Sequence, residues 1–345
     1  MTKHLLPLLL GTLATVLVAE AALRALPVST GYDLRAVDPS NPVLRGTSHF
    51  RYTYSRGWNL QLSNSGELNN YGFRASYDYV RDPRALVVIG NSFVQADALD
   101  PRDDMAERLG RRLGRPSYGI GSDGASLADY LADARWATGE FGTHTLLILL
   151  TTGDLKHACE PRPGQHFLNG AAALSLALVE RPVPSTFKRL LNDSRLFRYV
   201  FDNLRFAANW DKGWRRNQDQ PPDLQTAAAF DAGCGDHPDA GPATQFLMRE
   251  FHALEGARDA RVIFVLAPGY RREQGVEAGG QRDVDQFADR AEQSGFAVVR
   301  LTEAFDAALA TGTRLDFMPI DGHWNAAANA LAADVVAGAV SAFLR

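Results

Sequence analysis

Three runs of five apolar residues, at positions 85–89, 146–150 and 262–266, constrain the fold of this 345-residue chain more than any other feature. A run that is apolar at every position is typical of a strand buried on both faces, as in a parallel sheet. Shorter strand patterns occur at 117–120 and 297–299, and helical patterns separate the strands. The sequence therefore predicts an α/β fold, a flavodoxin-like doubly wound parallel sheet of about five strands.

Polar or glycine-rich segments follow the first three predicted strands, and another precedes the last predicted helix. They are Gly90-Asn91-Ser92, positions 121–124, positions 151–154, and Asp321-Gly322-His323. Because ligands of such folds bind at the carboxyl ends of the strands, we expect these segments to converge on one edge of the sheet. Each also has a simpler interpretation, since Ser92 and Asp321 could cap helices, the glycines could form tight turns, and His323 could be a surface residue.

The combination of Ser92, His323 and Asp321 favours nucleophilic catalysis. A nucleophilic serine needs a base within hydrogen-bond reach, and that base needs a carboxylate to orient it. Backbone N–H groups at glycine turns can supply an oxyanion hole. The chemistry expected is ester cleavage, in which His323 takes the proton of Ser92 and water or a sugar hydroxyl finally accepts the acyl group.

These segments carry a family resemblance to the SGNH (GDSL-like) hydrolases, which extends over about residues 68–345. Gly90-Asn91-Ser92-Phe93 resembles the first block of the family, which implies that Ser92 is the nucleophile. The segment at 118–124 resembles the second block. This implies that the backbone N–H groups of Gly124 and Ser92 are both oxyanion donors. Asp321-Gly322-His323 resembles the last block and implies that His323 is the base and Asp321 its partner. Positions 70–74 resemble a feature of exported members with an amino-terminal anchor.

Two positions depart from the family pattern. Asn91 replaces the usual aspartate of the first block. That aspartate is not a member of the triad. Gly153 stands where the third block has an oxyanion asparagine, and loss of one side-chain donor costs on the order of 3 kcal/mol of transition-state stabilisation. Either the backbone N–H of Gly153 donates, or another side chain substitutes, or activity is low.

Residues 1–26 are expected to be a signal anchor or a signal peptide. The chain is uncharged from Leu5 to Ala19, and Glu20 and Arg24 end the apolar run. An anchor would hold the protein in the cytoplasmic membrane with its catalytic domain outside, in the periplasm if the cell is Gram-negative. Cleavage near Ala19-Glu20-Ala21 would instead release it, and a buried core helix is the third alternative. Residues 27–80 are interpreted as an extended collar, and residues 81–345 as the hydrolase-like domain.

An insertion at 155–240 interrupts the alternation of strands and helices after the third predicted strand. Leu190, Phe197, Phe201 and Leu204 indicate a helix face within it. The segment could be a packed helical cap, or a lid or cradle for a polysaccharide or a membrane surface. Cys159 and Cys234 bracket the insertion, and in an oxidising compartment we expect them to form a disulfide.

The net charge and the absence of metal and phosphate-binding motifs argue against several other classes of function. The net charge of −4 gives no field that would attract nucleic acid. The eight histidines match no zinc spacing, and no phosphate-binding glycine loop is present, so neither a metal nor another cofactor is expected. The prediction is a serine esterase that acts on acyl esters, acetyl esters of envelope or secreted carbohydrate first among them. The alternatives are an O-acetyltransferase acting on exported polysaccharide, and a catalytically degenerate glycan-binding or scaffold protein; the oligomeric state is left open.

Overall fold

A five-stranded parallel sheet forms the centre of the protein. The computed structural model describes residues 5–170, 174–204, 241–268 and 278–341. The strands are β3 (Leu86–Gly90), β4 (Ser117–Gly121), β5 (Thr145–Leu150), β8 (Arg261–Leu266) and β9 (Ala297–Arg300). They lie in the order β4-β3-β5-β8-β9, and all neighbouring pairs are parallel. Counted within this sheet, the order is 2-1-3-4-5, which confirms the predicted flavodoxin-like fold.

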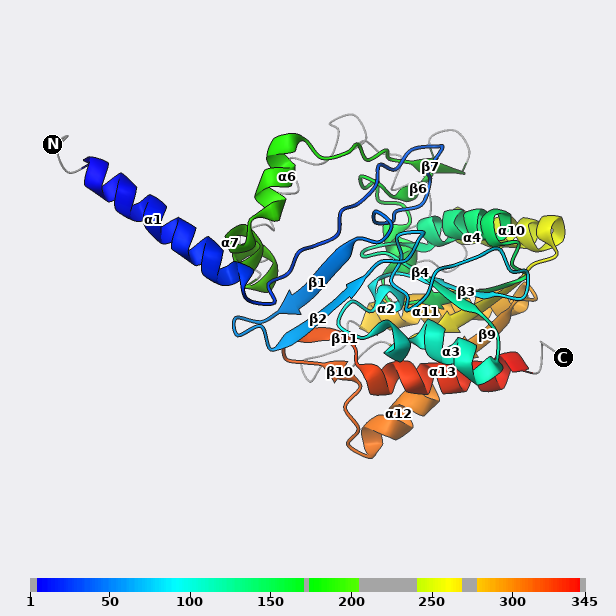
Figure 1. Cartoon of the computed structure of the whole chain (residues 1–345). Coiled ribbons are helices and arrows are strands. Elements are labelled where there is room, and N and C mark those ends of the chain that lie inside the picture. The colour runs from blue at the N-terminus through cyan, green and yellow to red at the C-terminus, as the bar shows by residue number, and fades with distance from the viewer. Residues whose placement is uncertain (1–4, 171–173, 205–240, 269–277, 342–345) are drawn as a thin grey trace.

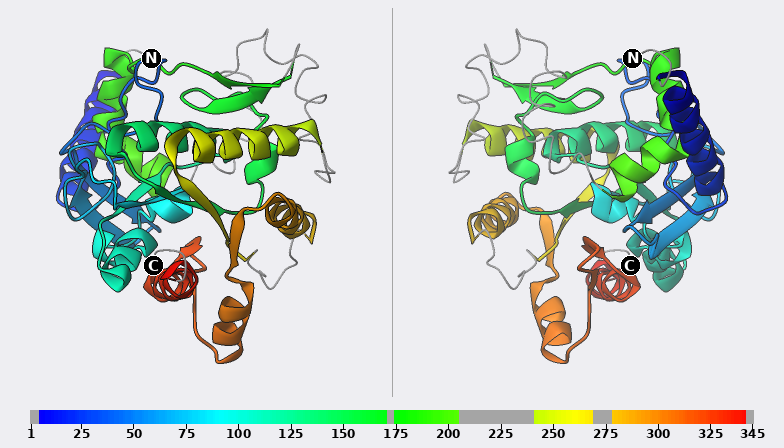
Figure 2. Two further views of the ribbon diagram at one scale, coloured as in Figure 1. Left: turned by 90° about the vertical axis from the view of Figure 1, so that its right-hand side faces the viewer. Right: turned by 90° about the vertical axis from the view of Figure 1, so that its left-hand side faces the viewer.

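Helices cover both faces of the sheet, as the two views of Figure 2 show. One face packs against α4 (Leu127–Phe141), α10 (Pro242–Arg258) and α11 (Ala278–Gln293), and the other against α3 (Met105–Leu113), α12 (Thr302–Ala310) and α13 (Ala326–Ser341). Successive side chains of a strand point to opposite faces, so Val87 and Ile89 lie in the first layer and Leu86 and Val88 in the second. All four are completely buried, which explains the uninterrupted apolar run at 85–89.

The amino-terminal region contains a long helix followed by a hairpin. Helix α1 (Leu5–Arg24) extends away from the rest of the molecule, and none of its residues is buried (Figure 1). Within the predicted collar, β1 (Arg51–Arg56) and β2 (Leu62–Glu67) pair as an antiparallel hairpin. A close backbone approach fixes the collar, because a Cβ on Gly72 would stand 1.9 Å from the carbonyl oxygen of Gly46. Gly72 also has a φ of +86°, a conformation that favours glycine.

The insertion contains a second hairpin and a series of short helices. The hairpin consists of β6 (His166–Asn169) and β7 (Ser175–Leu178), and the helices are α6 (Thr186–Asp193), α7 (Arg195–Arg198) and the π-helical turn η3 (Tyr199–Asn203). The predicted helix face is interrupted at Ser194, because the Ser194 hydroxyl accepts the N–H of Phe197 at 3.2 Å and starts a new helix. Residues 205–240 of the insertion lie outside the described part of the chain.

Short elements connect the large ones at the carboxyl edge of the sheet. They are α2 (Ser92–Gln95), the 3-10 turn η2 (Pro101–Asp103), α5 (Asp154–His157), β10 (Asp316–Phe317) and β11 (Asp321–Trp324). Strands β10 and β11 pair antiparallel, and the β10–β11 segment precedes α13. Ser92 lies in α2, and Asp321 and His323 lie in β11.

Candidate active site

Ser92 is the first residue of α2, directly after β3. Asn91 caps this four-residue helix, since its side-chain oxygen accepts the N–H of Phe93 at 3.0 Å. Gly121, at the end of the neighbouring strand, allows the close approach of α2, because a Cβ there would stand 2.3 Å from the backbone nitrogen of Gln95. The hydroxyl of Ser92 is thus held at the carboxyl end of the sheet, where the doubly wound fold binds ligands.

Ser92, His323 and Asp321 form one hydrogen-bonded chain. The Nε2 atom of His323 lies 2.8 Å from the Oγ atom of Ser92, and its Nδ1 atom lies 2.5 Å from Oδ1 of Asp321. The same Oδ1 atom accepts the backbone N–H of His323 at 3.0 Å. Because an ionised carboxylate only accepts, the Nδ1 atom carries the hydrogen, which leaves Nε2 of the neutral ring free to accept the Ser92 proton.

Asp321 is held in its ionised form by His323 and by a partner that the sequence analysis missed, Tyr54. The side chain of Asp321 is 1% exposed, and burial alone would raise its pKa. The bonds from His323, together with a hydrogen bond from the Tyr54 hydroxyl to Oδ2, instead hold the pKa of Asp321 well below its usual range. Arg56 lies 3.9 Å from Oδ2 and donates to the Tyr54 hydroxyl at 3.1 Å. The collar hairpin therefore completes the site from outside the sheet.

The one sequence signal for this contribution is the pattern His49-Phe50-Arg51-Tyr52-Thr53-Tyr54, which alternates as a short strand does. The structure contains this strand as β1, and the alternation puts Tyr52 and Tyr54 on one face of it. Nothing in their spacing connects Tyr54 with Asp321, which lies 267 residues later in the chain. The sequence around a buried acid such as Asp321 does not indicate which hydrogen-bond donor another part of the chain supplies.

Asn91 and Asp154 link the ends of β3 and β5. Asn91 donates its amide N–H groups to the Thr151 hydroxyl at 2.6 Å and to Oδ1 of Asp154 at 3.2 Å. Asp154 also accepts the backbone N–H of Thr151 at 2.7 Å and the hydroxyl of Tyr130 at 3.1 Å. Complete burial raises the pKa of Asp154 to about 7 in spite of these bonds. An amide at position 91 fits this arrangement, because it donates to the acid instead of placing a second carboxylate beside it.

Gly124 and Gly153 lie in the loops that follow β4 and β5. Both adopt positive φ angles, +72° and +92°. Within the described residues, neither glycine is hydrogen-bonded to Ser92, His323 or Asp321, and their backbone N–H groups donate to no other protein group. The ring of His157 lies over Gly153, with Nε2 3.3 Å from where a Cβ on that glycine would stand. The imidazole of His157 thus occupies the space into which a side chain at position 153 would extend.

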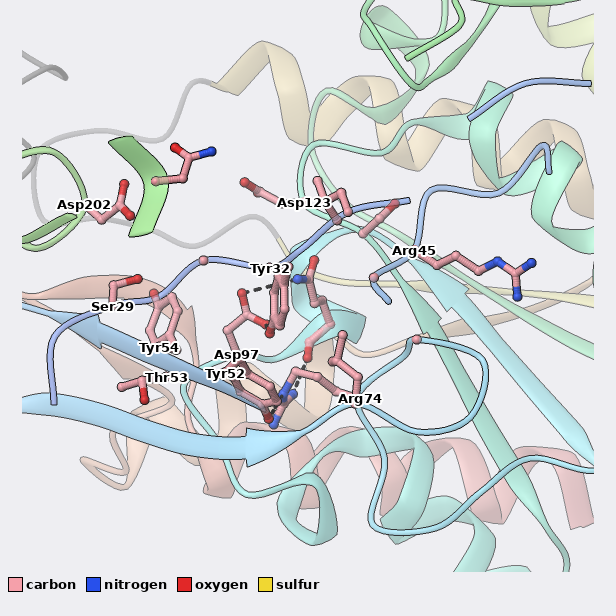
Figure 3. Close-up of a pocket in the computed structure, with 18 of the residues that line it drawn as sticks. Ser29, Tyr32, Arg45, Tyr52, Thr53, Tyr54, Arg74, Asp97, Asp123 and Asp202 are labelled. Carbon is pink, nitrogen blue, oxygen red and sulfur yellow. Dashed lines mark hydrogen bonds between the residues drawn. The ribbon is translucent and has the colours of Figure 1, made fainter. Parts of the chain in front are cut away.

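A large cavity lies near the Ser92–His323–Asp321 chain, and none of these three residues lines it. Its volume is about 1200 Å³, and the collar, the segments after β3 and β4, and the helices of the insertion line it (Figure 3). Gln95, one turn after Ser92, and Tyr54 are both part of its wall. Deeper in the wall, Tyr32 donates to Asp97 at 2.5 Å and Arg74 donates to the Tyr52 hydroxyl at 2.7 Å. Aromatic rings and polar groups therefore share the lining.

Two other predictions concern metal ions and the disulfide. Over the described ranges, no group of three or more His, Cys, Asp or Glu side chains is arranged to hold a metal ion. Cys159 is buried, at 4% exposure, whereas Cys234 lies outside the described residues. The pairing of Cys159 with Cys234 therefore stays a prediction.

Comparison with solved structures finds similar chains at low sequence identity and with TM-scores of about 0.4. No protein-family model and no curated protein sequence matches the chain. A proposed SGNH hydrolase from Slackia heliotrinireducens is 13% identical and covers 75% of this chain and 100% of its own, with a TM-score of 0.41. A lipolytic G-D-S-L family protein from Veillonella parvula is 11% identical, with coverages of 76% and 98% and a TM-score of 0.39.

A third similar structure is a carbohydrate esterase family 2 enzyme with a carbohydrate-binding domain, from Corynascus thermopiles. It is 12% identical, with coverages of 81% of this chain and 71% of its own and a TM-score of 0.37. SGNH and GDSL-like hydrolases are thus among the solved structures to which this chain is similar. The sequence motifs resemble the same family.

Proposed function

We propose that this protein is a serine esterase that cleaves acyl esters through Ser92, His323 and Asp321. The observation that carries the proposal is the continuous hydrogen-bonded chain from the Ser92 hydroxyl through both ring nitrogens of His323 to a buried carboxylate. A serine that only capped a helix would need neither the histidine nor the acid. The geometry is that of a nucleophile, its base and the group that orients the base.

The proposed reaction has two steps. The Ser92 oxygen attacks the ester carbonyl while His323 takes the serine proton, and the protonated ring then donates to the leaving alcohol as the acyl-enzyme forms. Water, activated in the same way by His323, releases the acid and restores Ser92. The backbone N–H groups of Ser92, Gly124 and Gly153 are the proposed oxyanion donors, and His157 is the candidate to replace the side chain that Gly153 lacks.

The proposed substrates are acyl esters, acetyl first among them, on cell-envelope or secreted carbohydrate. The mixed aromatic and polar wall of the cavity suits a sugar chain better than a purely apolar acyl tail. A cavity of about 1200 Å³ whose wall includes Gln95, one turn after Ser92, also leaves room for an acceptor, which favours O-acetyltransferase as the second candidate function.

We further propose that α1 anchors the protein in the membrane and that the catalytic domain lies outside it. In the described part of the chain, α1 is the one helix long and apolar enough to span a bilayer, with a mean hydropathy of 2.0. Cleavage near Ala19-Glu20-Ala21 would remove Glu20, which is hydrogen-bonded to the start of α7. These bonds favour the anchor over the cleaved signal peptide.

The function is tested with the full chain in detergent or membranes and with p-nitrophenyl acetate. Ser92→Ala is expected to lower kcat by at least about 10³-fold, and Ser63→Ala, a matched exposed serine on β2, to leave it unchanged. Equal hydrolysis by Ser92→Ala and the unmodified protein would contradict the proposal, and glycan binding retained in that case would favour the scaffold. Adding an oligosaccharide acceptor and measuring its acetylation distinguishes the transferase from the esterase.

A further inference from the structure

The end of α1 is joined to the insertion by a network of hydrogen bonds. One carboxylate oxygen of Glu20 accepts the backbone N–H of Arg195 at 3.0 Å, and the other accepts the N–H of Leu196 and the hydroxyl of Ser194, both at 2.9 Å. Arg24 holds the same carboxylate in place from the next turn of α1, at 2.9 Å. The start of α7, and with it the end of α6, is therefore fixed at the point where α1 leaves the domain.

Helix α6 exposes large apolar side chains beside this junction. Phe187 is 70% exposed and Leu190 68%, and the two lie three residues apart, on one side of the helix, together with Leu191. Lys188 and Arg189 stand between them in the sequence. A helix with large apolar residues on one side and basic residues beside them is typical of segments that lie in a membrane interface.

The collar hairpin adds an exposed tryptophan to the same end of the molecule. Trp58, in the turn between β1 and β2, is 75% exposed. The Tyr199 hydroxyl, just after α7, donates to its carbonyl oxygen at 2.6 Å and so ties this turn to the insertion. Figure 1 shows α6, α7 and the β1–β2 turn together at the end from which α1 extends. Tryptophan is enriched where proteins meet the headgroup region of a bilayer.

We propose that Trp58, Phe187, Leu190 and Leu191 form a membrane face, which rests on the lipid surface that α1 crosses. The occupant of this face is the bilayer rather than another protein, because the face lies beside the exit of an apolar 20-residue helix and has a basic neighbour, Arg189, suited to lipid phosphates. The inference rests on the proposed anchoring by α1. It adds an orientation, since an anchor alone would let the domain turn freely above the membrane.

This orientation places the cavity close to the lipid. Lys188, Asn192, Phe197, Arg198 and Asp202 line the cavity from the segment whose outer residues form the membrane face. One segment thus has the cavity on its inner side and the bilayer on its outer side. Substrates held at the membrane surface would reach Ser92 without diffusing into the bulk phase.

The test uses the full chain in vesicles of phosphatidylethanolamine and phosphatidylglycerol. The photoreactive amino acid p-benzoylphenylalanine replaces Phe187 or Leu190, and in the control it replaces Leu309, which is 43% exposed on α12, far from α1. After irradiation, mass spectrometry is expected to find phospholipid adducts at positions 187 and 190 and none at 309. Absence of lipid adducts at both positions, or adducts only to protein, would overturn the membrane face.

Two further measurements on the same samples separate this inference from the proposals on which it depends. The intact mass shows whether residues 1–21 are present, and a mature chain without them overturns both the anchor and this orientation. Hydrolysis of p-nitrophenyl acetate reports on Ser92 independently, because the substituted positions are exposed and lie outside the Ser92–His323–Asp321 chain. The esterase can therefore stand if the membrane face fails, and the reverse also holds.

Discussion

Replacing Tyr54 by phenylalanine is expected to slow ester hydrolysis without weakening substrate binding. The Tyr54 hydroxyl donates to Oδ2 of Asp321, and without it that oxygen keeps only Arg56, at 3.9 Å. A hydrogen bond to a buried charged group contributes about 1.5–3 kcal/mol. If the whole free energy of this hydrogen bond serves to hold the carboxylate against His323, its loss lowers kcat by about 10- to 100-fold, since 1.4 kcal/mol corresponds to a factor of ten. The KM should stay the same, because the ring of Tyr54 remains in the cavity wall.

The matched control is Tyr52→Phe, which makes the same change two residues earlier in β1. Tyr52 is buried, at 2% exposure, and its hydroxyl accepts from Arg74 instead of donating to Asp321. Both variants should lower the melting temperature, and only Tyr54→Phe should lower kcat on p-nitrophenyl acetate. Equal loss of kcat in the two variants, or full activity of Tyr54→Phe, would refute the positioning role of Tyr54.

The pH dependence of stability provides a second readout for the same pair. Because the pKa of Asp321 is lower in the folded than in the unfolded protein, its stabilisation is complete above about pH 4 and is lost as the pH falls towards the folded-state value. Tyr54→Phe removes part of that stabilisation, so the difference in melting temperature from the unmodified protein should shrink below about pH 4. For Tyr52→Phe it should not shrink in this way, since Arg74 stays charged at every pH of the experiment.

Three other substitutions test separate parts of the structure. Gly72→Ala should displace the collar and lower both the melting temperature and kcat. In the control Gly114→Ala, the glycine has a φ of +62° and open space around it, so the free energy of unfolding should fall by only about 1–2 kcal/mol. Equal melting temperatures of the two variants would contradict the role of the Gly46 contact. Burial raises the pKa of Asp154 to about 7, so its contribution to stability is lost as the pH rises from about 4 to 7; Asp154→Asn should flatten that fall in thermal melts. His157→Ala should lower kcat by about 10²-fold if the ring is an oxyanion donor, and unchanged kcat would remove it from the site.

Sequence reasoning predicted the sheet and the convergence of distant segments because both follow from local patterns. The apolar runs specify strands buried on two faces, and the doubly wound topology then brings the residues after each strand to one edge. Ser92 and His323, which are 231 residues apart, lie within hydrogen-bond distance for this reason. The cap of α4 is equally local, since Ser126 and Asp129, three residues apart, form a capping box.

The collar contribution could not be predicted in this way. Tyr54 reaches Asp321 because the whole hairpin lies against the sheet edge, and that docking depends on contacts such as Asn64 with the carbonyl of Asp97. Likewise, the position of His157 over Gly153 depends on the first turn of α5 and not on the motif around Gly153. The sequence indicated that the oxyanion asparagine is missing at Gly153. Only the structure shows that the ring of His157 lies in the space of that side chain.

The contact of Tyr54 with Asp321 also has a consequence for how the protein matures. Its two partners come from opposite ends of the chain, 267 residues apart, so one is synthesised long before the other. If the chain is exported as proposed, the collar reaches the far side of the membrane first, and the strand that carries Asp321 and His323 follows among the last segments. Ser92 would then have no complete set of partners until nearly the whole chain has crossed, and the proposed esterase activity should appear only after translocation rather than on partly exported chains.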